Sequence, residues 1–379
     1  MSKLTEQELI RYSRHLVLKD FGLENQLKLK EARVLVVGAG GLGSPALLYL
    51  AAAGVGTLGI VDFDTVAISN LQRQIIFTQE DVGRNKAEAA AARLHLLNPL
   101  IHVEKFPFQL TAVNALEVIK QYDIVLDGTD NFPTRYLLND ACVLLHKPLV
   151  YGSILQFEGQ VAVFNLKNKT GNFSTNYRDL FPEPPSPESV PNCEQAGVLG
   201  VLPGIIGTMQ ANEVIKIITT VAKPLTDKLV IFDALAMEMT TITIPNRNSR
   251  DTIKSLIDYE DFCGISPKNN KSLGMKEVTV QELDEMKKSG ADFQLIDVRE
   301  PYEYDICNLE GELIPMSDIP NNVEKISKDK KVVLHCRSGK RSSDMIVWLE
   351  KTHGFTNLYN LKGGVLAWAR EIDTDMPTY

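Results

Sequence analysis

The chain has 379 residues, of which 44% are hydrophobic and 23% charged, a composition typical of a folded protein of two or three domains. Its formal net charge of −8 argues against a nucleic-acid partner, because nucleic-acid-binding proteins usually present a basic face. Five cysteines without regular spacing argue against a disulfide framework, so we expect reduced thiols and a cytoplasmic protein.

Short apolar runs alternate with helical patterns in the first part of the chain. Strands are predicted at 32–37, 58–62, 101–106, 123–128 and 148–154, and helices at 44–53, 85–98 and 131–147. This alternation predicts an α/β fold with a doubly wound, Rossmann-like sheet. Segments 158–166, 228–234 and 239–245 favour antiparallel strands that extend this sheet.

The uncharged segment 34–61 resembles a membrane span only in its hydrophobicity. Glycines and a proline divide it into a strand, a glycine loop, a helix and a second strand. Strands that are buried on both faces of a parallel sheet are continuously apolar in this way. The N-terminus, MSKLTEQELIRYSRHL, is charged and polar, so we expect neither a signal peptide nor a membrane partner.

Composition also predicts the domain boundaries. Residues 264–276 are typical of a linker, which separates a nucleotide-binding domain at 1–263 from a smaller α/β domain at 277–379. The stretch 168–197, rich in Asn, Pro, Ser and Glu, is predicted to be a long surface loop.

The sequence GAGGLG lies between a predicted strand and a predicted helix and indicates a nucleotide site. It supplies Gly38, Gly40 and Gly43 in the G-x-G-x-x-G pattern. The glycines let the backbone approach a phosphate, and the helix N-terminus attracts the anion. Asp62 ends the next strand, where a carboxylate can bind ribose hydroxyls. These features alone also fit a nicotinamide dehydrogenase.

Further polar residues follow the strand ends, where open α/β sheets bind ligands. They are Asn70, Arg73, Lys86, Asp130 and Asn131. Two cations and one acid suit ATP with Mg²⁺ better than hydride transfer. Arg73 and Lys86 can stabilise phosphate charge, and Asp130 can hold the metal.

These motifs resemble the MoeB/ThiF/HesA adenylyltransferases, relatives of the ubiquitin-activating enzymes. The resemblance covers residues 5–245 and includes RYSRHLVL, SNLQRQ, VGRNKAEAA, DGTDNFPTRYLLND and GVLPGIIGTMQANEVIK. It implies an enzyme that uses ATP to adenylate the C-terminal glycine of a ubiquitin-like sulfur-carrier protein, similar to MoaD or ThiS.

The resemblance also implies roles for individual residues. Gly41 and Asp62 would bind the nucleotide, and Asp130 would bind Mg²⁺. Asn70, Arg73 and Lys86 would hold the phosphates, and Ser69 would also belong to the nucleotide site. The family is usually a homodimer, in which the arginine that matches Arg14 reaches the neighbour's ATP. From the residues alone, Arg14 is a charge on a surface helix.

Many members of this family bind a structural zinc ion through two Cys-x-x-Cys pairs, and this chain departs from that pattern. Asn176 and Asp179 stand at the first pair, and Glu260 and Cys263 stand at the second. One soft ligand out of four makes a poor zinc site, so we expect packing in place of zinc.

Two other cysteines of the first domain differ in context. Cys193 ends the predicted surface loop, and related enzymes with C-terminal sulfurtransferase domains have a reactive cysteine at the matching place. A functional role and an inert one remain open for it. Cys142 lies in an apolar predicted helix, so we expect it in the core.

The second domain resembles a single rhodanese domain over residues 277–371, from Asp-Val-Arg at 297–299 to Gly-Gly-x-x-x-Trp at 363–368. In this fold Cys336 starts a loop of backbone N–H groups, and the next helix adds its positive end. Arg337, Lys340 and Arg341 add full charges. All three effects favour a thiolate, which can accept a sulfur atom and hold a persulfide.

A phosphate-binding loop is the alternative for this sequence. Related phosphatases keep the Cys and the Arg but use a loop one residue longer. Here four residues separate Cys336 from Arg341, as in the sulfurtransferases. An adenylated carboxylate also needs a sulfur donor, which favours the sulfurtransferase.

Together the two domains predict an enzyme of the molybdopterin-synthase adenylyltransferase/sulfurtransferase type. The expected catalytic residues are Arg14, Arg73, Lys86, Cys193, Cys336 and Arg341. A cysteine desulfurase or thiosulfate would supply the sulfur. Two alternatives remain open: an adenylyltransferase acting on another substrate, such as tRNA or a thiamine-pathway carrier, and a non-catalytic scaffold that binds a ubiquitin-like protein.

Overall fold

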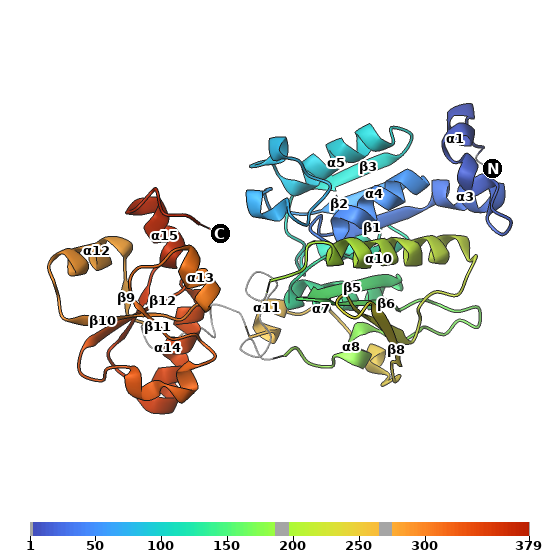
Figure 1. Cartoon of the computed structure of the whole chain (residues 1–379). Coiled ribbons are helices and arrows are strands. Elements are labelled where there is room, and N and C mark those ends of the chain that lie inside the picture. The colour runs from blue at the N-terminus through green and yellow to red at the C-terminus, as the bar shows by residue number, and fades with distance from the viewer. Residues whose placement is uncertain (1–2, 186–196, 265–274, 379) are drawn as a thin grey trace. The chain divides into compact units, whose positions relative to one another are not determined.

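The computed structural model describes residues 3–185, 197–264 and 275–378, which form two compact units (Figure 1). The first unit comprises residues 1–266, and the second comprises residues 267–379. The predicted linker at 264–276 lies almost entirely outside the described residues, and Cys193 lies outside them. Each unit has its own sheet and its own hydrophobic cores, so each is described separately.

The first unit is built on one eight-stranded sheet in the order β3-β2-β1-β4-β5-β6-β7-β8 (Figure 1). The strands are β1 (Arg33–Val37), β2 (Thr57–Val61), β3 (His102–Phe106), β4 (Ile124–Asp127), β5 (Leu149–Leu155), β6 (Glu158–Phe164), β7 (Lys228–Asp233) and β8 (Glu238–Thr243). Strands β1 to β5 pair in parallel, and β6 to β8 continue the sheet in antiparallel pairs. The predicted doubly wound fold and its antiparallel extension are therefore confirmed.

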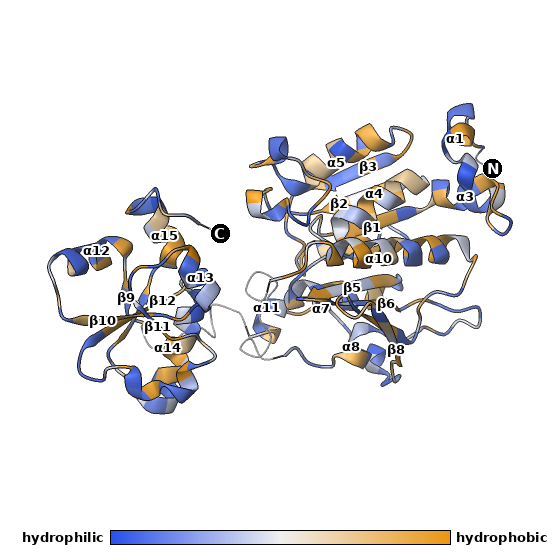
Figure 2. Ribbon diagram, viewed as in Figure 1, coloured by the Kyte–Doolittle hydropathy of each residue, from blue (hydrophilic) through white to orange (hydrophobic). Residues whose placement is uncertain are grey.

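Helices cover both faces of this sheet because the strand residues alternate between two buried cores. Val34 and Val36 pack with α3, α4, α5 and α10, whereas Leu35 and Val37 pack with α6 and α7. Apolar residues are concentrated along these central elements (Figure 2). The helices are α1 (Glu6–Arg11), α2 (Ser13–Leu16), α3 (Gly22–Glu31), α4 (Gly43–Ala53), α5 (Lys86–Leu97), α6 (Ala115–Ile119), α7 (Phe132–Leu145), α8 (Tyr177–Leu180), α10 (Leu202–Thr219) and α11 (Tyr259–Phe262), with 3₁₀ turns η1 (Ile68–Asn70), η2 (Gln79–Asp81) and η3 (Ser249–Thr252). Cys142, on α7, is fully buried as predicted.

The strand order fixes where a ligand can enter. Between β1 and β4 the chain reverses the direction in which it adds strands, so this pair is the topological switch point of the sheet. Both strands end here, at Val37 and Asp127, and the helices that follow them, α4 and α7, pack in the two different cores. Open α/β sheets bind their ligands in the crevice at such a point.

The second unit has a parallel five-stranded sheet in the order β11-β10-β12-β13-β9. Its elements are β9 (Glu277–Val278), α12 (Val280–Lys288), β10 (Phe293–Asp297), α13 (Pro301–Ile306), β11 (Glu312–Leu313), η4 (Ile319–Asn321), η5 (Val323–Lys325), β12 (Lys331–His335), α14 (Lys340–His353), β13 (Leu358–Leu361) and α15 (Gly364–Glu371). Helix α14 packs in the core on one face, and α12 and α15 pack in the core on the other.

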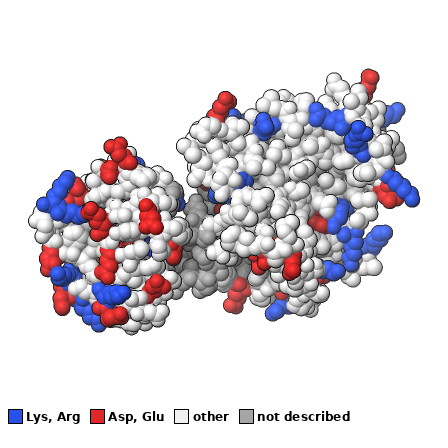
Figure 3. Space-filling model, in the orientation of Figure 1, with Lys and Arg blue, Asp and Glu red and all other residues white. Residues whose placement is uncertain are grey.

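Surface charge and hydrophobicity bear on the predicted partners. On the face of the second unit seen in Figure 3, acidic and basic side chains are interspersed. Among the described residues, no helix has both the length and the apolar character needed to cross a membrane.

Candidate active sites

A pocket lies at the switch point of the first sheet, at the ends of β1, β2 and β4. Its cavity volume is about 160 Å³, and it opens to solvent, so a ligand can enter it. Eight of the residues predicted from the sequence line it: Gly38, Gly40, Gly41, Asp62, Arg73, Lys86, Asp130 and Asn131. These eight residues come from the segments that follow β1, β2 and β4 and meet at one cavity.

The glycine loop after β1 is shaped by contacts that exclude side chains. Gly38 has a φ of +92°, and a Cβ there would lie 2.7 Å from the carbonyl oxygen of Gly128. A Cβ on Gly43 would lie 1.9 Å from the carbonyl oxygen of Gly38. The loop can therefore turn tightly into α4 and leave its backbone open to the pocket only with glycine at these positions. Gly43 shapes the loop from the helix side and does not itself line the cavity.

Asp62 holds the glycine loop from the end of β2. Its Oδ2 accepts a hydrogen bond from the backbone N–H of Ala39 at 2.8 Å, and its Oδ1 accepts one from Asp64 at 2.9 Å. Burial raises the pKa of Asp62, while the nearby Lys86 ammonium opposes that rise. The carboxylate lines the pocket, so the predicted ribose contact is sterically open to it and stays a prediction.

The two predicted phosphate-binding cations, Arg73 and Lys86, both line the pocket and have local partners. The ammonium of Lys86 is 3.0 Å from the Asp64 carboxylate, and the Lys86 side chain is only 8% exposed. Arg73 donates from Nη1 to the carbonyl of Ser69 at 3.1 Å. Asp64 is half exposed, so a polyphosphate entering the pocket can compete with it for Lys86.

Ser69 and Asn70, the other two residues predicted for the site in this segment, belong to the 3₁₀ turn that precedes Arg73. Asn70 accepts the backbone N–H of Ala67 on its Oδ1 at 3.1 Å, which closes the turn. Neither Asn70 nor Ser69 lines the pocket. In this structure they orient Arg73, and direct phosphate contacts by them remain a prediction.

Asp130 is presented at the pocket by a buried support. Beneath it, Asp127 accepts hydrogen bonds from the N–H and the hydroxyl of Thr129 at 2.9 and 2.6 Å. Arg135 donates to the carbonyl of Thr129 at 3.0 Å, and its Nε lies 3.9 Å from Asp127. Burial raises the pKa of Asp127, and the Arg135 guanidinium opposes that effect. Asn131 caps α7 by accepting the N–H of Thr134 at 3.0 Å.

A magnesium ion fits this arrangement as a partner of bound phosphate. Mg²⁺ is commonly held by one or two carboxylates together with phosphate oxygens and water. Asp130 provides one exposed carboxylate on the wall of a pocket that also contains Arg73 and Lys86. Among the described residues, no cluster of three or more His, Cys, Asp or Glu side chains is positioned to hold a metal by itself.

The sequence interpretation missed several lining residues. They are Asp64, Gln74, Phe108, Gln109, Leu110, Thr129, Thr134 and Ile154, together with Leu42 and Phe63. Residues 108–110 follow the end of β3 at the same edge of the sheet, so strand position was a usable signal for them. Arg14 lies on α2, is exposed, and does not line this pocket within the chain.

The second candidate site is the loop between β12 and α14. Cys336 is 1% exposed, and its Sγ accepts the backbone N–H of Gly339 at 3.2 Å. Gly339 has a φ of +90°, which turns the chain into α14. Helix α15 fixes the outer side of the loop, because Val365 and Leu366 donate to the carbonyls of Cys336 and Arg337, both at 3.0 Å.

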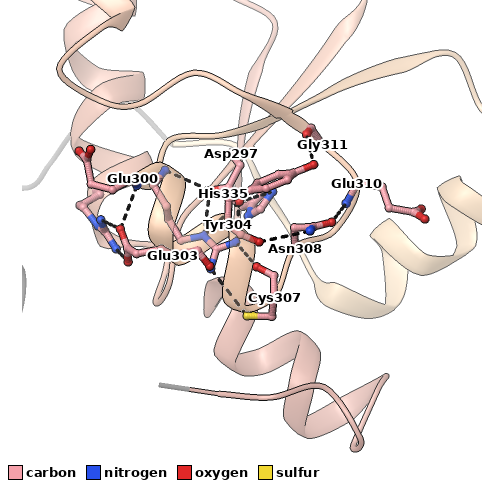
Figure 4. Close-up of polar contacts among 11 residues, drawn as sticks. Asp297, Glu300, Glu303, Tyr304, Cys307, Asn308, Glu310, Gly311 and His335 are labelled. Atoms are coloured by element: carbon pink, nitrogen blue, oxygen red, sulfur yellow. Dashed lines mark hydrogen bonds and ion pairs between the residues drawn. The ribbon is translucent and has the colours of Figure 1, made fainter.

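Arg341, one of the three cations predicted to surround Cys336, forms an ion pair that the sequence did not predict. Arg341 donates from Nη1 and Nη2 to the two carboxylate oxygens of Glu303, both at 2.6 Å. Glu303 is 4% exposed and lies on α13, in the group of residues shown in Figure 4. The guanidinium therefore joins the loop to α13, and much of its charge is neutralised there.

A buried polar cluster surrounds His335, the residue that precedes Cys336 (Figure 4). Arg299, from the Asp-Val-Arg turn, donates to both oxygens of Asp297 and to the carbonyl of Cys307 at 2.7 Å. His335 lies 3.8 Å from Asp297, and neither of its ring nitrogens has a hydrogen-bond partner. Burial lowers the pKa of His335 to about 4, although Asp297 favours the charged form.

An ion-pair cluster lies among the residues that stand at the zinc-ligand positions implied by the sequence resemblance, Asn176, Asp179, Glu260 and Cys263. Arg178 forms a bidentate pair with Asp140 at 2.8 and 2.7 Å, and Tyr259 donates to the same carboxylate at 2.8 Å. The Arg178 guanidinium lies 4.7 Å from the ring centre of Phe262. Asp179 accepts backbone N–H groups from Asn176, Arg247 and Ser249. This cluster, the Arg178 clasp, joins α7, α8, η3 and α11.

Comparison with known proteins defines the family. Residues 12–253 match the ThiF family, and residues 279–371 match the rhodanese-like domain. The chain therefore belongs to the ThiF family and carries a C-terminal rhodanese-like domain, as the sequence motifs predicted.

The relatives include chains with both parts. The chain is 47% identical to a Mycobacterium tuberculosis protein named probable adenylyltransferase/sulfurtransferase MoeZ, over 100% of this chain and 97% of that one. It is 41% identical to the Culex quinquefasciatus adenylyltransferase and sulfurtransferase MOCS3, over 100% and 91%. A Thermus thermophilus sulfur carrier protein adenylyltransferase is 51% identical and covers 69% of this chain and 98% of its own length. This protein is accordingly an adenylyltransferase with a sulfurtransferase domain.

Solved structures support the fold of the first unit. The crystal structure of E. coli MccB with ATP has a TM-score of 0.55 and 22% identity to this chain, and the match covers 62% of this chain and 71% of MccB. At this identity the similarity concerns the fold alone.

Proposed function

We propose that this protein uses ATP to adenylate the C terminus of a ubiquitin-like sulfur-carrier protein and then delivers sulfur to it from Cys336. The observation that carries the proposal is the presence, in one chain, of an open pocket lined by Arg73, Lys86 and Asp130 and of a buried cysteine whose sulfur accepts the N–H of Gly339. The relatives named for sulfur-carrier adenylation and for sulfur transfer support the same combination.

In the first step the carrier's terminal carboxylate attacks the α-phosphorus of ATP. A P–O bond forms, and pyrophosphate leaves with the electron pair of the bond that breaks. Arg73 and Lys86 stabilise the charge that develops on the phosphates, and Lys86 exchanges Asp64 for phosphate oxygen as ATP binds. When bound, Mg²⁺ held by Asp130 and the phosphates neutralises further negative charge.

In the second step the outer sulfur of a Cys336 persulfide attacks the carrier's acyl carbon, and AMP leaves with the electron pair of the acyl–phosphate bond. The product is an acyl disulfide between the carrier and Cys336. A second thiolate then attacks the sulfur of Cys336, and the carrier leaves as a thiocarboxylate. Cys193 is a candidate for this thiol or for a preceding acyl acceptor, and either role requires it to be accessible.

A homodimer belongs to the proposal because of the surface beside Arg14. Exposed apolar side chains gather on the N-terminal helices and the turns between them: Leu9, Ile10, Val17, Leu18 and Leu23. An apolar surface of this kind suits burial against a second copy. We also propose a cytoplasmic location, where ATP is available and Cys336 stays reduced. The pathway that the carrier serves, molybdenum cofactor biosynthesis or another, is set by the carrier's identity.

Carrier-dependent ATP–pyrophosphate exchange tests the proposed function. Candidate MoaD-like and ThiS-like carriers should each be assayed with the full chain, and the products weighed by mass spectrometry. A 16 Da increase, from the replacement of one oxygen by sulfur, is expected on a carrier supplied with ATP and thiosulfate or a cysteine desulfurase. Exchange stimulated by tRNA and by no carrier would instead support the alternative substrate, and absence of any exchange would support a scaffold.

A further inference from the structure

Ser342 is a buried hydroxyl beside the sulfur of Cys336 that the proposed mechanism has not yet used. It is the third residue of α14 and is fully buried. Its Oγ lies 2.7 Å from Oδ1 of Asn360, 3.2 Å from the carbonyl oxygen of Gly339 and 3.6 Å from Sγ of Cys336. Asn360, on β13, is itself only 5% exposed.

The three contacts compete, because a serine hydroxyl has one hydrogen to donate. When Cys336 is a neutral thiol, the amide oxygen of Asn360 is the closer and better acceptor. When Cys336 is a thiolate, its sulfur is an ionised acceptor in a site that excludes water, and hydrogen bonds to charged groups are roughly twice as strong as neutral ones. A rotation of the hydroxyl hydrogen is enough to change partners.

We propose that Ser342 is a catalytic hydroxyl of the sulfur-transfer half, which donates to Asn360 when Cys336 is a thiol and to Sγ when Cys336 is a thiolate. The inference rests on the proposed function of Cys336 as the sulfur-carrying residue. It adds a second donor to the Gly339 N–H, so that two neutral groups stabilise the sulfur anion while Arg341 is paired with Glu303.

Thiosulfate and cyanide separate the two steps in which this donor acts. In loading, the Cys336 thiolate attacks the outer sulfur of thiosulfate, a new S–S bond forms, and sulfite leaves with the electron pair of the old one. In unloading, cyanide attacks the outer sulfur of the persulfide, thiocyanate forms, and the electron pair returns to Cys336 as a thiolate. Ser342 stabilises the thiolate that is the nucleophile in the first step and the leaving group in the second.

The two steps should respond differently to loss of the hydroxyl. A less stabilised thiolate is scarcer at neutral pH but more nucleophilic, so part of the loss in loading is offset and disappears at high pH. As a leaving group the same thiolate departs more slowly at every pH. Ser342→Ala should therefore slow unloading about tenfold throughout, and should slow loading only below the pH at which Cys336 ionises in that variant.

The experiment uses the full chain and stopped-flow measurement of both steps, with iodoacetamide alkylation of Cys336 followed against pH. Ser343→Ala is the matched control, since the hydroxyl of Ser343 lies 3.3 Å from the sulfur of Met275. We expect the alkylation midpoint to rise by about one pH unit in Ser342→Ala and to stay unchanged in Ser343→Ala.

Asn360→Leu distinguishes a chemical role from damage to the fold. This variant removes the competing acceptor but keeps a side chain of similar shape, so the alkylation midpoint should fall and unloading should not slow. Shifts of the alkylation midpoint in opposite directions in Ser342→Ala and Asn360→Leu support the proposal. Equal slowing in both variants, or an unchanged midpoint in Ser342→Ala, overturns it.

Cys336→Ser keeps this test separate from the test of the proposed function. If Cys336→Ser retains sulfur transfer from thiosulfate to cyanide, Cys336 is not the sulfur-carrying residue and the proposed function itself fails. If Cys336→Ser abolishes transfer while Ser342→Ala behaves as wild type, the proposed function stands and only the role of Ser342 falls.

Discussion

The two candidate sites treat negative charge in contrasting ways. In the first unit, Arg73 and Lys86 line an open pocket, and Lys86 is held by a half-exposed Asp64 that a ligand can replace. In the second unit, Arg341 forms a bidentate pair with the buried Glu303, and the sulfur of Cys336 faces the N–H of Gly339 and the hydroxyl of Ser342.

This difference matches the difference between the two proposed cargoes. A nucleotide enters and leaves with several charges, so its site needs cations whose existing partners are easily exchanged. A persulfide sulfur is covalently attached and carries one charge, so neutral dipoles in a water-excluded loop are sufficient. A loop whose main guanidinium is already paired is also poorly suited to bind a free phosphate dianion, which agrees with the sulfurtransferase interpretation.

The largest effect on activity is expected from the loss of the Asp130 carboxylate in the first site. Asp130→Asn should lower carrier-dependent ATP–pyrophosphate exchange by about 1,000-fold, about 4 kcal/mol in the transition state, because the carboxylate that would hold Mg²⁺ is lost. Glu80→Gln is the control, since Glu80 is exposed and does not line the pocket. Exchange within tenfold of wild type in Asp130→Asn would remove Asp130 from the site.

The next effect concerns how the first unit is held together. Arg178→Ala should lower its free energy of unfolding by about 3 kcal/mol, since the buried Asp140 carboxylate loses its bidentate partner. Circular dichroism during urea unfolding measures this. Arg84→Ala should cost less than about 1 kcal/mol, because the Arg84–Asp81 pair has an Arg84 side chain that is 50% exposed.

The same experiment tests the role of metal. Because the Arg178 clasp ties α7, α8 and α11 together through protein groups, treatment with a chelator should leave the urea midpoint of the wild-type protein unchanged. A fall in that midpoint, reversed by stoichiometric Zn²⁺, would contradict the expectation that packing replaces zinc here.

A smaller effect is expected from the buried histidine of the second unit. In the folded state burial lowers the pKa of His335 to about 4, below the value of about 6.5 in an unfolded chain. The unfolded state therefore binds more protons in this window, and stability should fall by roughly 2 kcal/mol as the pH drops from 6.5 to 5. Trp348 and Trp368 are the two tryptophans of the chain, so tryptophan fluorescence reports on this unit alone.

His335→Phe provides the comparison. The ring nitrogens of His335 have no hydrogen-bond partners, so an apolar ring can replace the imidazole without breaking such a bond. This variant should lose the His335 contribution to the pH dependence, and its stability should fall less steeply between pH 6.5 and 5. Identical slopes in the two proteins would show that other groups cause the acid sensitivity.

The smallest effect on stability is expected from two glycine substitutions, which distinguish backbone strain from an effect on sulfur transfer. Gly339→Ala and Gly354→Ala each place a side chain at positive φ, at the two ends of α14, and each should cost about 1 kcal/mol. A Cβ at 339 would also lie 3.0 Å from the carbonyl of Leu361, whereas a Cβ at 354 has nothing within 4 Å. Only Gly339→Ala should slow thiosulfate–cyanide sulfur transfer, and equal slowing in both variants would deny the Gly339 N–H a special role.

Local signals in the sequence were enough to predict the fold class and eight of the residues that line the pocket. The glycine loop, Asp62 and Asp130 each follow a strand, and parallel strands bring their carboxyl ends to one edge. Asp64 was missed because nothing in the sequence pairs it with Lys86, 22 residues away. The lining residues after β3 were missed although their strand position indicated the same edge.

The second site shows why side-chain partners are harder to predict than strands. The sequence placed Arg341 near Cys336 and suggested that it stabilises the thiolate. Its partner, Glu303, is 38 residues earlier on α13, and only the packed structure brings the two together. Ser342 and Asn360 meet across 18 residues for the same reason. The Arg178–Asp140 pair of the first unit is likewise a long-range contact that no local sequence pattern predicts.

The central claim is that one chain carries two chemically separate sites, and Cys336→Ala tests it most directly. The substitution removes the sulfur atom, and Cys336 is not among the residues that line the pocket of the first unit. Carrier-dependent ATP–pyrophosphate exchange should therefore remain within about twofold of wild type, while the carrier thiocarboxylate disappears from the mass spectrum. If Cys336→Ala eliminates exchange in a protein that unfolds at the wild-type temperature, the two-site account is contradicted and the loop at 336–341 belongs to the nucleotide chemistry.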